Sequence, residues 1–208
     1  MNEELLVVLM TVLGYLLGAI PFGIVVSKAM GLPDPRTVGS KNVGFTNVLR
    51  ASGSKAGALT LLGDMGKGWV IGWAAMQWLT DERFIMLVAL SVILGHIFSP
   101  FLNFKGGKGV ATALGAVLGL SPSIGLLLVL IWLGAVAIWR YSSGGALAAF
   151  ACLPVVAIVN EQRQEFLVFA LIVSGLIWIK HKDNLVRLWK GTENKIGKTK
   201  QGLGDREQ

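Results

Sequence analysis

Long apolar runs separated by short polar segments dominate the chain. The apolar runs cover residues 5–27, 56–79, 84–101, 110–139, 143–159 and 166–179. Most of these runs approach or reach the roughly 20 residues that an α-helix needs to cross a bilayer. They do not alternate with polar residues, as the strands of a membrane β-barrel would. The pattern therefore predicts an all-α polytopic membrane protein, with a kink at Pro21 inside the first run.

The run over 110–139 is either one long helix or two helices hinged at Ser121–Pro122–Ser123. With the hinge, nearly all of the 19 Lys and Arg residues fall in segments on one side of the membrane. Without it, the basic C-terminal tail lies on the opposite side from the other basic loops. Because basic loops stay in the cytoplasm, the sequence predicts seven transmembrane helices, with the N-terminus outside and the C-terminus cytoplasmic. The helix before the hinge is short, so we expect a thinned bilayer or close protein packing around it.

The first polar stretch whose residues suggest a binding site is GHIFSPFLNFKGGKGVAT, residues 95–112. Glycine lets a ligand approach the backbone, and successive N–H groups in a glycine turn can bind an anion. Lys105 and Lys108 add positive charge, and His96 leads into the loop. The stretch predicts a phosphate site at a membrane surface. The alternative is a short loop whose glycines turn the chain and whose lysines mark the cytoplasmic side.

A second stretch, GSKNVGFTNVLR at residues 39–50, lies in the polar segment over 28–55. Its hydroxyl and amide side chains can bind a ligand, and Arg50 presents a planar fork that matches a phosphate or carboxylate. The alternative is a solvated loop made of ordinary turn residues.

Asp64 and Lys67 lie inside the apolar run over 56–79. A charge within a span costs about 2.5–3.5 kcal/mol on insertion scales and marks a candidate functional site. Their i, i+3 spacing places both on one helix face, where they can pair. The alternative to function is a self-neutralising pair near the cytoplasmic end, with Lys67 extending toward the interface.

A third stretch, KHKDNLVRLWKGTE at residues 180–193, follows the last apolar run. His181 and Asn184 share a face of a continued helix. Leu185, Leu188 and Trp189 give that helix an apolar side that suits the membrane surface. The predicted topology places all these polar stretches on the cytoplasmic side, which favours one joint site.

Several familiar sites are absent from the sequence. It contains no Walker A motif, no H-x4-D pair, no G-x-S-x-G elbow, no Cys–His cluster and no grouped carboxylates. We therefore expect no metal and no cofactor, and phosphate chemistry that relies on Arg, Lys and backbone N–H groups. The net charge of +7 is explained by basic cytoplasmic loops, so no nucleic-acid partner is expected.

Together the three stretches resemble the motifs of the bacterial acyl-phosphate:glycerol-3-phosphate acyltransferase family, whose first motif is usually written GSGNxGATNxxR. The segment DMGKG at residues 64–68 also fits this family. Two positions depart from the first motif. Lys41 stands where the family usually has glycine, and Phe45 stands where it usually has alanine.

The resemblance implies an integral enzyme of the bacterial cytoplasmic (inner) membrane with its active site facing the cytoplasm. Such an enzyme moves the acyl group of an acyl phosphate to the 1-hydroxyl of glycerol 3-phosphate and produces lysophosphatidic acid. We expect one transmembrane catalytic domain over 1–192, a polar, disordered cytoplasmic tail over 193–208, and a monomer in contact with membrane lipid. An acyl phosphate is already activated, so orientation and electrostatics can carry the reaction.

The resemblance also suggests roles for individual residues. Ser40, Arg50 and Lys108 are expected to hold the acyl-phosphate group together with the N–H groups of Gly106 and Gly107. Asn184 and His181 are expected to position glycerol 3-phosphate, and either His181 or the leaving phosphate takes the hydroxyl proton. The further candidates are the helpers Lys67 and Lys105, the loop-holding residues Asn42, Thr46 and Asn47, Glu193 as tail anchor or glycerol ligand, and Gly39 and His96 at the site.

Two other classes of protein stay open from the residues alone. Intramembrane charges and a basic inner mouth also suit a carrier of phosphorylated anions, although the chain shows no inverted repeat and its polar residues crowd one side. A membrane-bound interaction protein would explain the basic tail, but not the three glycine- and amide-rich stretches.

Overall fold

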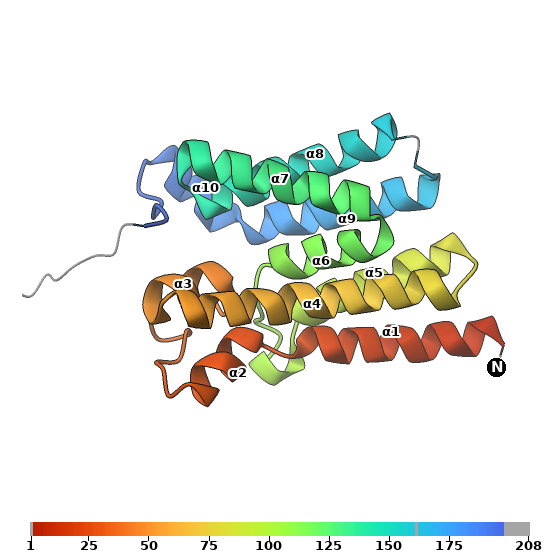
Figure 1. Cartoon of the computed structure of the whole chain (residues 1–208), viewed down its shortest axis with the longest axis horizontal. Coiled ribbons are helices and arrows are strands. Elements are labelled where there is room, and N and C mark those ends of the chain that lie inside the picture. The colour runs from red at the N-terminus through yellow and green to blue at the C-terminus, as the bar shows by residue number, and fades with distance from the viewer. Residues whose placement is uncertain (1, 161, 198–208) are drawn as a thin grey trace, which may run out of the picture.

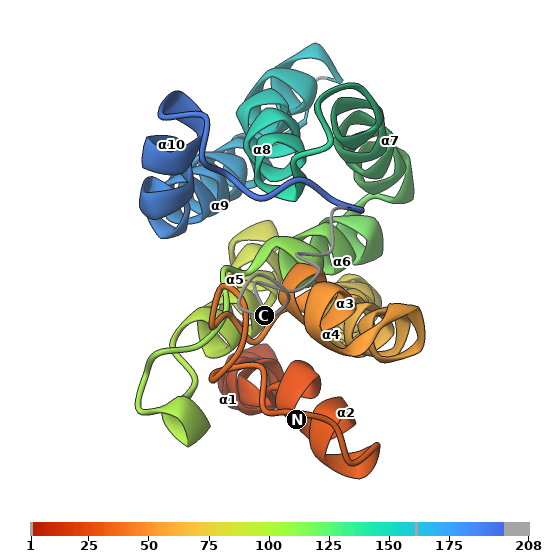
Figure 2. The ribbon, with the colours of Figure 1, turned by 90° about the vertical axis from the view of Figure 1, so that its left-hand side faces the viewer.

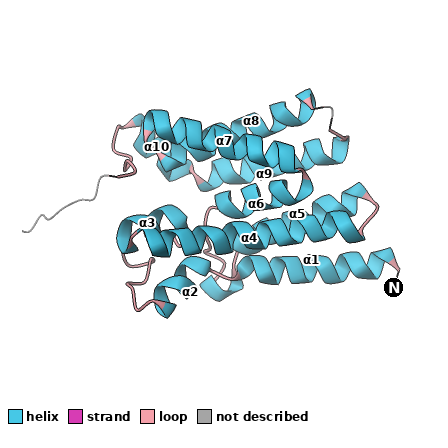
Figure 3. Ribbon diagram, viewed as in Figure 1, coloured by secondary structure: helices cyan, strands magenta, loops and turns pink. Residues whose placement is uncertain are grey.

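The computed structural model describes residues 2–160 and 162–197, and all regular secondary structure within them is helical (Figure 3). The long helices run side by side along one axis, and the short helices α2, α3 and α10 gather at the end opposite the N-terminus (Figure 1). The helices are α1 (Glu3–Ala19), α2 (Phe22–Ala29), α3 (Phe45–Ser52), α4 (Ser54–Trp78), α5 (Glu82–Ile97), the 3-10 turn η1 (Pro100–Leu102), α6 (Val110–Leu120), α7 (Pro122–Trp139), α8 (Ser142–Val159), α9 (Gln164–Lys180) and α10 (Lys182–Trp189).

The first apolar run is broken at Pro21, as predicted, and α1 and α2 meet at 47°. A break of this kind frees backbone carbonyl groups, which must find other donors in an apolar environment. Ser99 Oγ donates to the carbonyl of Ala19 at 2.6 Å. Lys67 Nζ donates to the carbonyl of Ile20 at 2.8 Å. The break is therefore stabilised by donors from two distant parts of the chain.

Close backbone contact between α4 and α6 holds the short helix α6 inside the molecule. A Cβ on Gly115 would lie 1.9 Å from the carbonyl oxygen of Met65, and a Cβ on Gly68 would lie 2.1 Å from that of Thr112. Only glycine permits two helices to approach this closely. Most residues of α6 are buried, which agrees with the expectation that protein packs around this helix.

Helix α6 lies between two groups of helices, α1–α5 on one side and α7–α10 on the other (Figure 2). The predicted hinge is confirmed, because α6 ends at Leu120, Ser121 is extended, and α7 begins at Pro122. The polar segment over 28–55 has no apolar run that would predict a helix, but it contains α3 and the start of α4. Val48 of α3 is fully buried, so packing stabilises a helix that the local sequence does not predict.

Within the described residues, three helical segments are long and apolar enough to cross a bilayer: α5 with η1, α7 and α8. The number rises to five when the bent pairs α1–α2 and α9–α10 each count as one span. Helix α4 has 25 residues but carries Asp64 and Lys67, and α6 has only 11 residues. The seven-span topology therefore stays a prediction.

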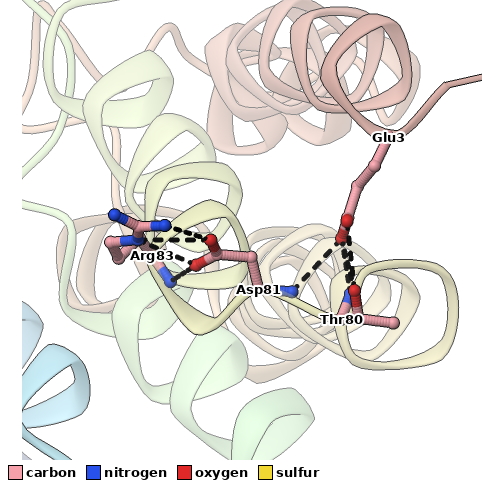
Figure 4. A network of polar contacts seen from close by, with 4 residues as sticks. All are labelled: Glu3, Thr80, Asp81 and Arg83. Atoms are coloured by element: carbon pink, nitrogen blue, oxygen red, sulfur yellow. Dashed lines mark hydrogen bonds and ion pairs between the residues drawn. The ribbon is translucent and has the colours of Figure 1, made fainter.

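Polar contacts tie together the helix ends near the N-terminus (Figure 4). The carboxylate of Glu3 accepts hydrogen bonds from the backbone N–H groups of Thr80 and Asp81 and from the Thr80 hydroxyl. Arg163, in the turn between α8 and α9, pairs with Glu82 at 2.9 Å. These contacts join three chain segments at the end of the bundle opposite α3 and α10.

Candidate active site

A cavity of about 430 Å³ lies at the end of the molecule that carries α3 and α10. Residues from all three polar stretches line it, together with residues of α4, α6, α7 and α8. The polar part of the lining includes Ser40, Asn42, Thr46, Asn47, Arg50, Asp64, His96, Lys108, Ser142, Ser143, His181, Asn184, Arg187 and Glu193. The apolar part includes Phe45, Leu61, Met65, Val110, Ala111, Leu114, Val129, Trp132, Leu133 and Ala146.

Asn47 organises the loop that presents the first stretch to the cavity. Its buried amide nitrogen donates to the carbonyl oxygens of Pro35, Val38 and Asn42 at 2.8–3.2 Å. Its amide oxygen accepts the backbone N–H of Ser40 at 2.8 Å. Asn47 thus uses its whole side chain to hold the loop, which is the role expected for it.

Three more positions show why this loop favours small or turn-forming residues. The Asn42 side chain accepts the N–H of Gly44 at 2.9 Å and closes a turn. Gly39 has φ +60°, and a Cβ there would lie 2.3 Å from the amide oxygen of Asn47. Lys41 is exposed and also has a positive φ, +58°. The glycine of the family motif would adopt this conformation without strain.

Helix α3 is linked across the cavity to the C-terminal part of the chain. The hydroxyls of Thr46 and Ser142 lie 2.7 Å apart, and Arg50 Nη2 donates to the carbonyl of Asn194 at 2.7 Å. Arg50 Nε is buried and has no hydrogen-bond partner within the described residues. Burial lowers the pKa of Arg50, but a guanidinium stays protonated at neutral pH. Arg50 therefore places a charged, partly unsatisfied group at the cavity.

Lys108 brings the second stretch into the cavity. Its ammonium group donates to the amide oxygen of Asn184 on α10. Burial and, next, the positive charge of Arg187 lower the pKa of Lys108 to about 8. Lys108 is therefore mainly a cation at neutral pH, in a place where an anion would stabilise it.

The N–H groups of Gly106 and Gly107 are not available to a ligand, contrary to our expectation. They donate to the carbonyl oxygens of Ile97 and His96, each at 3.1 Å, and so cap the C-terminal end of α5. A Cβ on Gly107 would lie 2.1 Å from His96 Nε2. These glycines serve close packing against His96, and the expected phosphate nest is replaced by a helix cap.

The two expected lysine helpers lie outside the cavity lining. Lys105 is exposed on the loop. Lys67 pairs with Asp64 at 2.8 Å, as their spacing predicted, but its side chain is 1% exposed and does not extend toward the interface. Of this pair only Asp64 lines the cavity, where its Oδ1 lies 3.4 Å from His96 Nδ1.

The third stretch supplies a neutral histidine and an oriented amide. His181 is buried, and its Nδ1 donates to the carbonyl of Ile177 at 2.8 Å, which leaves Nε2 free to accept. Burial and, next, the charge of Lys108 lower the pKa of His181 to about 4. Asn184 donates to Glu193 Oε1 at 2.7 Å, so its oxygen faces Lys108. Both side chains line the cavity.

Glu193 anchors the segment that follows α10. Its Oε1 also accepts from the Ser143 hydroxyl at 2.8 Å, and its Oε2 accepts from Arg187 Nε at 2.6 Å. Burial acts to raise the pKa of Glu193, but the hydrogen bond from Arg187 and those from Ser143 and Asn184 hold it below its usual value. Both oxygens are occupied within the protein, which supports the anchoring role. The tail therefore reaches the site with Glu193 and Asn194, and the N–H of Ile196 donates to the carbonyl of Arg140 at the end of α7, while residues 198–208 lie outside the described residues.

Sequence reasoning missed four polar residues of the cavity, Arg187, Ser142, Ser143 and Asn194. Arg187 follows Asn184 by three residues, so the helical spacing that paired His181 with Asn184 would also have found it. The two serines begin α8, in a short segment without any motif. Within the described ranges, no group of three or more His, Cys, Asp or Glu residues is arranged to hold a metal ion.

The arrangement suits an anionic ligand with an apolar part. A family model described as glycerol-3-phosphate acyltransferase matches residues 8–191. The chain belongs to the glycerol-3-phosphate acyltransferase family. It is therefore an acyltransferase of an integral membrane family, as the three polar stretches suggested.

Relatives and solved structures agree with this family assignment. The chain is 46% identical over 196 residues to the glycerol-3-phosphate acyltransferase of Bordetella pertussis, with 91% of each chain covered. It is 46% identical over 184 residues to that of Methylobacillus flagellatus, covering 88% of this chain and 94% of the relative. The crystal structure of PlsY (YgiH), an integral membrane glycerol 3-phosphate acyltransferase, in its glycerol 3-phosphate form is similar with a TM-score of 0.88 and 38% identity, and 92% of this chain and 96% of that chain are covered. A lysophosphatidic acid form of that enzyme gives a TM-score of 0.86 and 37% identity, covering 92% and 95%.

Proposed function

We propose that this enzyme transfers the acyl group of an acyl phosphate to the 1-hydroxyl of glycerol 3-phosphate, releasing lysophosphatidic acid and phosphate. One observation carries the proposal: a single cavity joins a cationic wall to an apolar wall. Membership in the glycerol-3-phosphate acyltransferase family supports the acceptor. The acyl-phosphate donor rests on the resemblance of the three stretches and on the chemistry of the cavity.

The apolar wall suits the acyl chain of the donor. It is formed by side chains of α4, α6, α7 and α8, including Leu61, Met65, Leu114 and Trp132. An acyl chain placed there leaves water and packs against apolar surface, which favours binding by about 0.8 kcal/mol for each buried CH₂. The head of the same molecule then lies at the polar end of the cavity.

The polar wall suits two phosphate groups. We assign the phosphate of the donor to Arg50, Lys108 and Ser40, which line this wall. We assign glycerol 3-phosphate to Arg187, Asn184 and His181, which line the same cavity. Fixed cations next to developing negative charge stabilise a transition state without reorganisation.

In the proposed reaction the 1-hydroxyl oxygen attacks the acyl carbonyl carbon. A carbon–oxygen bond forms to the glycerol, and the carbon–oxygen bond to phosphate breaks, with its electron pair leaving on the phosphate. The hydroxyl proton goes to the leaving phosphate rather than to His181, because a pKa of about 4 makes His181 a weak base at neutral pH. His181 Nε2 acts instead as a hydrogen-bond acceptor that orients the hydroxyl.

We further propose that the enzyme is a monomer with seven spans in the bacterial cytoplasmic (inner) membrane. In this topology α4 and α6 complete the set of spans, the N-terminus lies outside, and the cavity faces the cytoplasm. The basic segments at the cavity end support this orientation through the positive-inside rule. Water-soluble glycerol 3-phosphate then reaches the site from the cytoplasm, and the donor reaches it from the bilayer.

Phosphate release tests the function directly. Purified enzyme in lipid receives palmitoyl phosphate and glycerol 3-phosphate, and phosphate and lysophosphatidic acid are followed in parallel. We expect equal amounts of both products, only when both substrates are present. Arg50→Ala should abolish turnover, whereas Lys105→Ala, on the exposed loop, should not change it. Phosphate release without glycerol 3-phosphate would indicate a hydrolase, and counterflow of labelled glycerol 3-phosphate without acyl transfer would indicate a carrier.

A further inference from the structure

Phe45 is an apolar residue at the polar end of the cavity. It is the first residue of α3 and lines the cavity next to residues that carry charge and hydroxyls. It also stands where the first motif of the family usually has alanine. Phenylalanine adds a whole ring to the cavity wall where alanine would present only a methyl group.

The packing of α3 on α4 fixes the height of Phe45 along the cavity. Leu49, one turn after Phe45, packs on Gly57, where a Cβ would lie 2.9 Å from the Leu49 Cβ. Gly57 lies one turn before Leu61, which lines the cavity from α4. Phe45 and Leu61 are therefore at the same level, where the apolar wall begins.

The start of α3 is held in place by hydrogen bonds to α8 and to the loop that precedes α3. The hydroxyl of Thr46, the next residue, forms a hydrogen bond with the Ser142 hydroxyl at 2.7 Å. Asn47, the residue after that, is bonded to three loop carbonyls. These contacts restrict movement of the Phe45 backbone, from which the ring extends to the cavity wall.

We infer that Phe45 is a specificity-determining residue that selects the acyl donor by its shape next to the carbonyl group. The inference rests on the proposed function, in which Arg50 and Lys108 hold the donor phosphate. The first carbons of the acyl chain then pass Phe45, whereas Met65, one turn deeper on α4 than Leu61, contacts later carbons. The ring leaves room for an unbranched chain and excludes a methyl branch on the carbon next to the carbonyl.

Competing donors test this inference. For the wild type and Phe45→Ala, kcat/KM is measured with palmitoyl phosphate and with 2-methylpalmitoyl phosphate. One methyl group in an apolar pocket is worth about 10–200-fold in discrimination. We expect the wild type to prefer the unbranched donor by at least about tenfold, and Phe45→Ala to remove most of that preference. The KM for glycerol 3-phosphate should not change.

Two further variants make the result specific. Phe45→Leu keeps an apolar side chain of intermediate size and should give an intermediate preference, which also tests the inference if Phe45→Ala fails to fold. Phe101→Ala removes a ring that is 62% exposed and outside the cavity, and it should behave as wild type. If Phe45→Ala and Phe45→Leu retain the wild-type preference, the inference is wrong. If the wild type transfers no acyl group from either donor, the proposed function fails instead.

Discussion

Lys67→Met removes a buried charge while keeping an unbranched side chain. Lys67 Nζ lies 2.8 Å from Asp64 Oδ1 and 2.8 Å from the carbonyl oxygen of Ile20. The two charged side chains are only 1% and 2% exposed. The substitution therefore leaves a buried carboxylate without its lysine and leaves the carbonyl at the α1–α2 break without a donor.

Removing one partner of a buried ion pair costs about 3–5 kcal/mol. His96 Nδ1 lies 3.4 Å from Asp64 Oδ1 and compensates in part, so we expect the lower end of that range, about 3 kcal/mol. For a chain of this size, that loss lowers the unfolding temperature by roughly 6–12 °C. At a temperature where the variant is folded, the KM for glycerol 3-phosphate should equal that of the wild type, because Lys67 does not line the cavity.

Thermal unfolding of the detergent-solubilised protein, followed by tryptophan fluorescence, measures the stability change. Asp64→Asn combined with Lys67→Met removes both charges and should recover much of the loss, since no unpaired carboxylate is left buried. A Lys67→Met variant that unfolds at the wild-type temperature but has a raised KM would refute this reasoning. It would show that Lys67 serves a substrate phosphate rather than the helix break.

Three further predictions concern the loops, the helix contacts and pH. Lys41→Gly relieves a positive φ and should stabilise the protein by about 1 kcal/mol, measured as a higher unfolding temperature. Gly115→Ala forces a Cβ against the Met65 carbonyl and should cost about 1–3 kcal/mol, while Gly175→Ala on α9 has open space and serves as its control. Activity measured as kcat/KM should fall as pH rises above about 8, where Lys108 loses its charge, and His181→Asn should leave any limb near 6.5 unchanged, because the pKa of His181 is about 4. An alkaline limb that Lys108→Arg leaves at the same pH would contradict the assignment to Lys108.

The main helices follow from local properties of the sequence. An apolar run of sufficient length forms a helix when lipid or another part of the protein covers its side chains. Helices α5, α7, α8 and α9 therefore lie close to where the pattern predicted them. Proline placed both breaks, at Pro21 and at Pro122, because it lacks a backbone N–H. The pairing of Asp64 with Lys67 also follows from helical spacing alone.

The polar stretches of the site were also visible in the sequence, because histidine, lysine and arginine are conspicuous among apolar runs. The tertiary structure decided what each residue does. Gly106 and Gly107 cap α5, Lys67 serves a carbonyl that lies 47 residues earlier in the chain, and Arg187 enters the cavity. The reason is that a backbone N–H or a charged side chain bonds to whichever partner the fold brings near. Helical periodicity depends on neighbouring residues, but the partners of buried polar groups depend on how distant helices pack.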